Sequence, residues 1–468
     1  MSDYIRNSSA AFTEFLKQTR NLLKTGQGQF LISFVFPAEK IEIENRLNTL
    51  CKNQELFFYA DKPSEGIMFF GINSVLTFAE KGEKRFASLD KTVNNLRGQL
   101  ISNRRDINFF IPLFLGGMKF TIEHSDNDWK DFDDSGWFIP ELLYLKNQEK
   151  YYFVYNIFVP SKANPESIVA KFESVLKQFF SSGDKDENKE LRLLKISGNE
   201  PKDKKKWKNQ VTGLLEKIED GELQKIVLSR KVELIFTTDI SIPPVLKSLV
   251  ENYPQCTLFI YHKGKSSFIG ASPETMVRFQ DREMHLEILA GSAGRGSSEI
   301  EDLKMEKELL NSSKDLNEHS LAVNYVKSAL EKSAETIEIS SPSIQKLRNI
   351  QHLRTSINVN LNDNNSIINL IGKIHPSPAV CGIPSDAALN VIKKTETHQR
   401  GLYAGLIGWF NLQDEGEMVL AIRSALAVGN KLIAYAGCGL VKGSNPDAEF
   451  KETELKLKPF LSIFHNEN

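Results

Sequence analysis

The sequence predicts an α+β protein in which strands and helices do not alternate strictly. Short apolar runs rich in β-branched and aromatic residues predict strands, for example FLISFVF at 30–36 and KYYFVYNIFV at 150–159. Amphipathic spacing predicts helices over 9–24 and 301–333. Because several predicted strands follow one another without a helix between them, a doubly wound parallel sheet is not expected.

Breaks along the chain divide these elements into two parts. Pro112 and Pro140 interrupt apolar runs and predict edge strands or strand ends. The charged stretch at 181–206 predicts a linker or a long surface loop. We therefore expect an N-terminal part (1–206) and a second part (207–468).

The second part begins with a predicted helix that stops at Gly221, followed by a strand over 225–236. Later apolar runs also favour strands, at 257–262, 267–273, 276–279, 367–376, 402–410, 418–428 and 431–440.

The composition limits the possible partners. The 468 residues include 59 basic and 60 acidic side chains, so no excess positive charge favours nucleic acid or an anionic membrane. No apolar stretch is long enough for a membrane span, and no signal peptide is expected. The four cysteines form no C-x-x-C pair, which argues against zinc or a disulfide framework and favours a cytoplasmic protein. We expect small-molecule partners.

Two acidic pairs could form a metal site. Asp315 and Glu318 are three residues apart on a predicted helix, and Glu449 and Glu452 repeat that spacing on another. Oxygen ligands in this number suit a hard cation such as Mg²⁺. Two solvated helix faces would give the same spacing.

Two glycine-rich segments, at 288–296 and 436–446, follow predicted strands and lead toward the acidic helices. Glycine lets an anion approach backbone N–H groups. Neither segment matches a phosphate-binding loop or a dinucleotide-binding motif, so nucleotide binding is not supported. Plain turns are the alternative interpretation.

Three basic side chains stand out. Lys225 opens an apolar strand, where loss of hydration favours the neutral amine. Arg423 lies inside the predicted strand at 418–428 and needs a carboxylate from the protein or from a ligand. His352 is either a ligand contact or a structural residue. No Ser-His-Asp pattern and no H-E-x-x-H motif is visible.

In this order and spacing the motifs resemble the chorismate-utilising enzymes, which include anthranilate, aminodeoxychorismate, salicylate and isochorismate synthases. The resemblance covers about 207–462, with the motifs KIVLSR, FIGASPE, AGSAGRG, DLNEH, QHLRTSI, HPSPAVCGIPSDAA and GLVKGSNPDAEFKETELK. It extends more weakly to the N-terminal part. It implies one α+β fold with two large, mostly antiparallel sheets packed face to face and helices outside, into which 1–206 is integrated.

The resemblance also implies site residues. Mg²⁺ would be held mainly by Glu318 and Glu452, with Asp315 and Glu449 at companion acidic positions. Chorismate would be bound or surrounded by Gly291, Ser292, His352, Ala379, Val380, Tyr403, Ile422, Arg423, Gly437, Gly439 and Lys456. Of these, Tyr403, Arg423 and Lys456 match side chains that bind the enolpyruvyl part.

Lys225 matches the general base of family members that add water to C2, and Glu274 matches the general acid that protonates the departing C4 hydroxyl. Water attack at C2 with loss of this hydroxyl gives isochorismate, which feeds menaquinone or catecholate siderophore synthesis. Ala379 favours release of isochorismate, because salicylate synthases usually carry Thr there. The alternatives are a salicylate synthase and a catalytically silent homologue.

Ammonia is not the expected nucleophile, so no amidotransferase subunit is implied, and a monomer suits the family. Three positions depart from the usual residues of the family, namely Phe450 for Trp, Ser292 for Thr and Asp315 for Glu.

Overall fold

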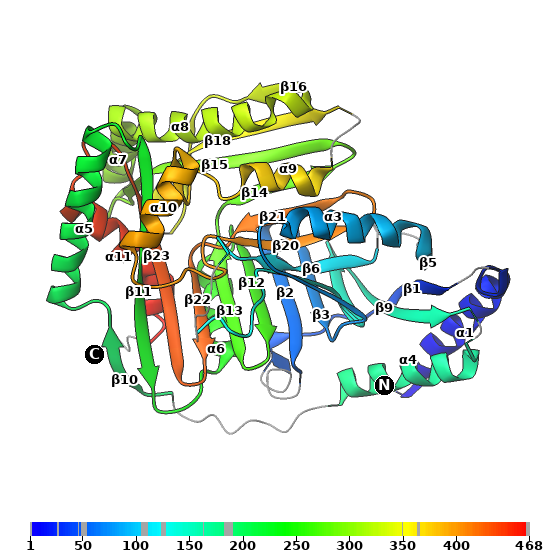
Figure 1. Ribbon diagram of the computed structural model, residues 1–468. Coiled ribbons are helices and arrows are strands. Elements are labelled where there is room, and N and C mark those ends of the chain that lie inside the picture. Colours follow the sequence, from blue (N-terminus) through cyan, green and yellow to red (C-terminus); the bar gives the residue numbers. More distant parts are fainter. Residues whose placement is uncertain are drawn as a thin grey trace.

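Two large sheets pack against each other, and most helices lie outside them (Figure 1). The structure is a computed structural model and describes residues 2–25, 28–44, 46–47, 54–103, 111–122, 128–161, 163–181, 191–348, 350–362 and 366–464. Of the strand pairings in these ranges, only one, between residues 31–33 and 100–102, is parallel. The predicted α+β fold with two mostly antiparallel sheets is therefore confirmed.

Among the described residues, the larger sheet has 13 strands. In spatial order they are β10 (Leu193–Ser197), β11 (Lys225–Phe236), β23 (Lys431–Leu440), β22 (Ser424–Val428), β13 (Ser266–Ser272), β12 (Thr257–Lys263), β2 (Leu56–Lys62), β3 (Ile67–Ile72), β8 (Leu142–Asn147), β9 (Lys150–Pro160), β1 (Gln29–Pro37) and β5 (Leu100–Ser102), with β19 (Gly382–Ile383) beside β11.

The smaller sheet has 10 strands in the part of the chain that the structure describes. In spatial order they are β16 (Ala334–Ile339), β18 (Ile350–Leu361), β15 (Glu283–Gly294), β14 (Thr275–Gln280), β21 (Gly416–Leu420), β20 (Leu406–Asn411), β6 (Leu113–Met118), β7 (Ser135–Ile139) and β4 (Leu76–Glu80), with β17 (Ser343–Lys346) beside β18.

The helices given by the described residues are α1 (Ser2–Thr25), α3 (Arg85–Leu96), α4 (Pro165–Phe180), α5 (Pro201–Glu219), α6 (Ile242–Asn252), α7 (Glu299–Leu310), α8 (Ser313–Leu330), α9 (Ile367–Ile374), α10 (Ser385–Thr395) and α11 (Pro446–Leu461), together with the short 3₁₀ helices η1 (Pro63–Glu65), η2 (Arg97–Gln99) and η3 (Glu331–Ser333). Helix α8 packs on β15, and α11 packs on β23. These two helices carry the four acidic residues of the predicted metal site. No helix in the described ranges is long and apolar enough to cross a membrane.

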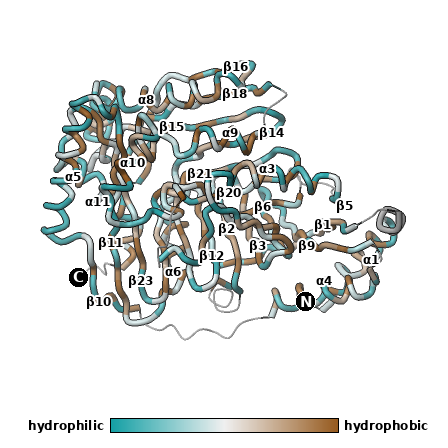
Figure 2. The backbone as a smooth tube through the Cα atoms, viewed as in Figure 1, coloured by the Kyte–Doolittle hydropathy of each residue, from teal (hydrophilic) through white to brown (hydrophobic). Residues whose placement is uncertain are grey.

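Alternation along the strands separates two hydrophobic cores. On β2, Phe58 points into the core between the sheets, whereas Phe57 and Tyr59 point to the opposite face, which packs against helices such as α1 and α4. Hydrophobic residues accordingly run along the central strands (Figure 2). Burial on both faces explains why these runs read as almost continuously apolar.

Strands from both halves of the chain meet in both sheets. β2 pairs with β12, which brings Tyr59 opposite Ile260, and β6 pairs with β20. Residue 206, the expected boundary, lies inside α5. The division at this residue stays a prediction.

Several elements differ from their prediction. The stretch 301–333 forms two α-helices rather than one, because Ser312 caps α8 by accepting a hydrogen bond from Asp315 N. The run at 367–376 is largely helix α9 rather than a strand. The described parts of 181–206 contain β10 and the start of α5, while residues 182–190 lie outside the described ranges.

Other predictions agree with the structure. Pro112 directly precedes β6 and Pro140 separates β7 from β8, so both mark strand ends. The helix predicted over 9–24 lies within α1. Cys256, Cys381 and Cys438 are buried free thiols, and Cys51 lies outside the described ranges.

Candidate active site

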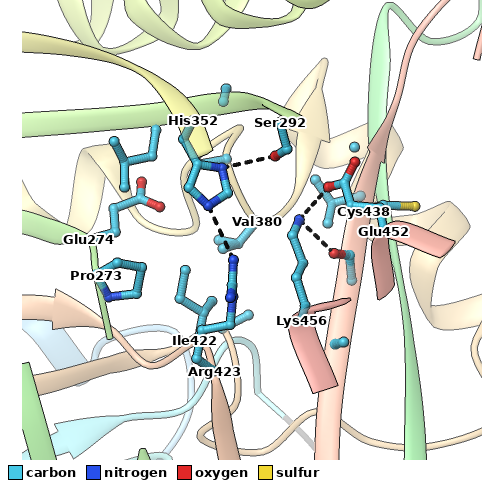
Figure 3. Close-up of a pocket in the computed structure, with 18 of the residues that line it drawn as sticks. Pro273, Glu274, Ser292, His352, Val380, Ile422, Arg423, Cys438, Glu452 and Lys456 are labelled. Carbon is cyan, nitrogen blue, oxygen red and sulfur yellow. Dashed lines mark hydrogen bonds and ion pairs between the residues drawn. The ribbon is translucent and has the colours of Figure 1, made fainter. Parts of the chain in front are cut away.

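One pocket brings together most of the predicted site residues (Figure 3). Those that line it are Glu274, Gly291, Ser292, Glu318, His352, Ala379, Val380, Tyr403, Ile422, Arg423, Gly437, Gly439, Glu452 and Lys456. Lys225, Asp315 and Glu449 are not among the residues that line it, although Lys225 pairs with Glu318. The free space in the pocket is about 60 Å³.

A bulge in β15 shapes one wall. The register of β15 against β18 shifts between Leu289 and Ser292, and Gly291 has φ +79°. A Cβ on Gly291 would lie 3.0 Å from the Cβ of Asp315. Glycine therefore permits both the left-handed backbone and the close approach of α8.

His352 connects this wall to Arg423. Arg423 Nη2 lies 3.1 Å from Nε2 of His352, and Nδ1 of His352 lies 2.9 Å from Ser292 Oγ. Because a guanidinium can only donate, Nε2 must accept, so the neutral ring carries its proton on Nδ1 and donates it to Ser292. Burial and the charges of Arg423 and Lys456 hold the pKa of His352 well below its usual value.

Arg423 lies between two strands, not inside one as the sequence predicted. β21 ends at Leu420 in the smaller sheet and β22 begins at Ser424 in the larger one. Arg423 occupies the crossover with φ +49°, which costs a non-glycine residue about 1 kcal/mol. Its side chain is 6% exposed and Nε has no hydrogen-bond partner among the described residues. A buried guanidinium held in this way favours an anionic ligand.

Lys225 is fully buried and forms an ion pair with Glu318 of α8, with 2.9 Å between Nζ and Oε1. Although burial alone would raise it, the Lys225 ammonium keeps the pKa of Glu318 below its usual value. Gly439 makes room for this pair, because a Cβ there would lie 2.1 Å from Glu318 Oε1.

Helix α11 supplies the other acids. It begins where Asn445 caps Asp447 N and Ala448 N and Pro446 occupies the first turn. Glu452 pairs with Lys456 at 2.5 Å, and Lys456 also donates to Gly437 O at 3.0 Å.

β22 pairs with β23 only up to Ala434, and beyond it Gly437 O accepts a hydrogen bond from Lys456 of α11. N–H and C=O of one strand residue point to the same side, so Gly437 and Gly439 both present backbone groups to the pocket.

The companion acids Asp315 and Glu449 also accept hydrogen bonds. Glu449 accepts a hydrogen bond from Lys314 at 2.7 Å, and Asp315 accepts one from the Ser312 hydroxyl. Burial raises the pKa of Asp315, and the charges of Glu318 and Glu452 add to this effect.

The acids fit Mg²⁺ as a partial ligand set. In the described part of the chain no three His, Cys, Asp or Glu side chains converge as a complete metal site. Glu318 and Glu452 both reach the pocket, however, and Mg²⁺ usually takes one or two protein carboxylates and completes its shell with substrate oxygens and water.

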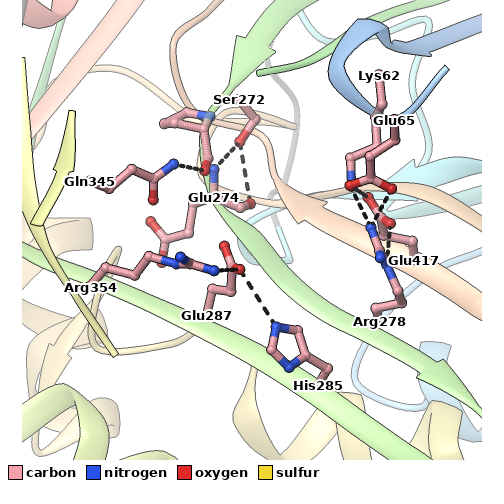
Figure 4. Close-up of polar contacts among 11 residues, drawn as sticks. Lys62, Glu65, Ser272, Glu274, Arg278, His285, Glu287, Gln345, Arg354 and Glu417 are labelled. Carbon is pink, nitrogen blue, oxygen red and sulfur yellow. Dashed lines mark hydrogen bonds and ion pairs between the residues drawn. The ribbon is translucent and has the colours of Figure 1, made fainter. Parts of the chain in front are cut away.

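Glu274 stands in the turn between β13 and β14 and is 4% exposed. Ser272 fixes this turn by donating to Leu420 O at 2.6 Å, and Gln345 donates to Pro273 O at 3.4 Å (Figure 4). Burial raises the pKa of Glu274 to about 8, although a hydrogen bond to the Leu289 backbone and the charge of Lys225 counteract it. This carboxyl group is therefore largely protonated at neutral pH.

Sequence reasoning missed part of the lining. Arg400 lies in the wall and pairs with Glu396 at 2.6 Å, both side chains being 2% exposed. Their spacing of four residues was a usable signal. Cys438 and Tyr435 also line the pocket, and the Tyr435 ring stacks on Tyr403. Nothing in the sequence singled them out from other apolar strand residues.

The fold and the pocket define a two-sheet α+β protein whose buried site favours a small anionic ligand. Residues 14–465 match the family described as chorismate binding enzyme. The chain also shares 31% identity over 418 residues, 88% of either protein, with isochorismate synthase MenF from Bacillus subtilis. It therefore belongs to the family of chorismate-binding enzymes.

Further relatives agree with this family. Over 414 residues the chain is 30% identical to the salicylate biosynthesis isochorismate synthase of Pseudomonas aeruginosa, covering 85% of this chain and 83% of that protein. The solved structure of the menaquinone-specific isochorismate synthase MenF from Escherichia coli superposes with a TM-score of 0.76 at 22% identity, covering 97% of this chain and 100% of that one. At this identity the likeness concerns the fold.

Proposed function

We propose that the protein is an Mg²⁺-dependent isochorismate synthase that converts chorismate reversibly to isochorismate. The observation that carries this proposal is a buried glutamic acid that lines the pocket, Glu274, together with a buried lysine, Lys225, that pairs with the pocket carboxylate Glu318. Hydration at C2 with loss of the C4 hydroxyl needs one group that takes a proton and one that gives a proton. The names of the relatives from B. subtilis and P. aeruginosa support the same reaction.

Substrate binding follows from Arg423, a buried pocket cation that forms no ion pair among the described residues. Arg423 would pair with the enolpyruvyl carboxylate, with Tyr403 and Lys456 beside it and His352 keeping the guanidinium in place. Backbone groups of Gly291, Ser292, Gly437 and Gly439 would complete the anion contacts, and Ala379, Val380 and Ile422 would pack on the ring. Mg²⁺, held by Glu318 and Glu452 with Asp315 and Glu449 close by, would neutralise the ring carboxylate.

The proposed reaction balances without a net gain or loss of protons. Lys225, which must first release its ammonium proton to solvent, takes a proton from water as the water oxygen bonds to C2, and the two ring double bonds shift toward C4. Glu274 gives its proton to the C4 hydroxyl, which leaves as water. Burial favours the neutral form of Glu274 before the step. The reverse reaction uses the same two groups with their roles exchanged.

The product distinguishes this reaction from its alternatives. Ala379 favours release of isochorismate, and relatives in both menaquinone and siderophore synthesis carry the name isochorismate synthase. We propose either pathway as the consumer, with a cytoplasmic monomer and no amidotransferase subunit. A salicylate synthase would go on to eliminate pyruvate, and a silent homologue would bind chorismate without turnover.

Product analysis tests the proposal. The purified protein is incubated with chorismate and Mg²⁺, and the mixture is separated by chromatography. We expect isochorismate in equilibrium with chorismate. Mainly salicylate and pyruvate would show a lyase instead, and unchanged chorismate would show a silent homologue.

A further inference from the structure

Arg230 is a buried cation on the same strand as Lys225. Its side chain belongs to the KIVLSR motif, is 8% exposed, and forms no ion pair among the described residues. Burial lowers the pKa of Arg230 to about 10, although the charges of Glu454 and Asp203 counteract it. Burying a guanidinium costs free energy that a neutral side chain at this position would avoid. The contacts of Arg230 therefore indicate a specific role for this side chain.

The guanidinium connects three segments. Nε donates to Thr453 Oγ1 at 2.7 Å, and the group lies 4.3 Å from the ring centre of Phe450. Nη1 donates to Gly198 O at 3.0 Å and to Asn199 Oδ1 at 3.2 Å. Arg230 thus joins β11 and the turn before α5 to helix α11.

Its two contacts on α11 adjoin the acidic residues. Phe450 follows Glu449, and Thr453 follows Glu452. Residues three apart share one helix face, so Phe450 and Thr453 form a row beside the row of Glu449 and Glu452. A side chain that binds the residues of one row fixes the rotation of the helix about its axis. It thereby also fixes the direction in which the residues of the other row point.

Thr453 is suited to this contact because its side chain is shielded from solvent, so that no water molecule competes with Arg230 for its hydroxyl. It is 0% exposed, and its hydroxyl donates to Phe450 O at 2.7 Å. Its oxygen is therefore oriented to accept from Arg230. On the acidic row, Lys314 of α8 holds Glu449.

We propose that Arg230 is a positioning residue that acts through Thr453 and Phe450 to hold Glu452 and Glu449 in place for the metal. The inference rests on the proposed function, because it assumes that these acids bind Mg²⁺. Arg230 is not among the residues that line the pocket. Its loss should weaken metal binding more than it slows the metal-saturated enzyme.

The experiment uses Thr453→Val, which keeps the side-chain shape but removes the acceptor. Mn²⁺ binding to the full-length protein is titrated by electron paramagnetic resonance without chorismate. Supporting partners of metal ligands typically contribute about 10- to 100-fold in affinity, so we expect Thr453→Val to bind Mn²⁺ about tenfold more weakly. Thr453→Ser keeps the hydroxyl and should bind like the wild type. At saturating Mg²⁺, kcat of Thr453→Val should return to nearly the wild-type value.

Thermal unfolding of the same variants separates positioning from stability. If Thr453→Val unfolds at a lower temperature but binds Mn²⁺ as tightly as wild type and Thr453→Ser, the positioning role is overturned. Arg230→Lys keeps the charge and loses the Nε contact, so it should reproduce the weaker binding. If the wild-type protein binds no Mn²⁺, the proposed metal site fails, and this inference fails with it.

Discussion

The protonated state of Glu274 should appear as a measurable loss of stability at high pH. Glu274→Gln replaces the carboxyl group with a neutral amide of the same shape. Burial raises the pKa of Glu274 from 4.5 to about 8. In the unfolded chain the group ionises near its ordinary pKa, whereas in the folded protein it keeps its proton up to about pH 8.

The sign and size of the effect follow from this difference. Between the two pKa values the folded state binds one proton more than the unfolded state, so wild-type stability falls as pH rises. Each pKa unit corresponds to about 1.4 kcal/mol. The pKa difference therefore costs about 3 kcal/mol at pH 7 and about 5 kcal/mol above pH 8, and Glu274→Gln should remove this cost.

Urea unfolding of wild type and Glu274→Gln at intervals between pH 5 and pH 9 measures this difference in the free energy of unfolding. We expect the two proteins to differ little near pH 5, the variant to become the more stable one as pH rises, and its activity to be lost throughout. A stability difference that does not change with pH would refute the argument that burial keeps this acid protonated.

Three further predictions concern Lys225, Gly439 and Arg423. Lys225→Gln should lower kcat by about 10²- to 10⁴-fold, the usual contribution of a general base, while chorismate binding measured by calorimetry stays near wild type; substantial turnover would exclude Lys225 as the base. Gly439→Ala should weaken Mg²⁺ binding, because the added Cβ would lie 2.1 Å from Glu318 Oε1. Gly213→Ala is the control, because its Cβ would have no atom within 4 Å, and equal Mg²⁺ affinities in the two variants would contradict this crowding. Arg423→Gln should raise KM for chorismate by about 10- to 100-fold, as expected for a lost charged hydrogen bond. Arg97→Gln, whose partner Asp414 is at the surface, serves as control, and an unchanged KM in Arg423→Gln would exclude Arg423 from substrate binding.

Local patterns placed the acidic residues on helices and located most of the strands, whereas the metal-binding role of these acids stays a prediction. Glu318 and Glu452 stood out because a spacing of three on a helix is visible in the sequence, and β11 begins at Lys225 as its apolar run indicated. The pairing of Lys225 with Glu318 was not visible, because no local rule links residues so far apart in the chain. The same holds for Arg230 and Thr453.

The remaining differences between the predicted and the observed elements have specific physical reasons. Helix α9 buries Ile367, Ile368, Leu370, Ile371 and Ile374, and a short segment that is apolar on most sides cannot be assigned from periodicity alone. The break before α8 had a signal in the sequence, because Ser312 and Asp315 have the spacing of a capping box. Arg423 was placed in a strand because the residues around it are apolar, whereas its left-handed backbone follows from the crossover between two sheets.

The central claim is that water adds to C2 while the C4 hydroxyl leaves. Turnover of chorismate in water enriched in ¹⁸O, followed by mass spectrometry of the isolated isochorismate, tests this claim directly. We predict one ¹⁸O atom in the product, located in the new hydroxyl at C2. Isochorismate that forms without ¹⁸O would contradict the assignment of Lys225 and Glu274 as base and acid of a water addition.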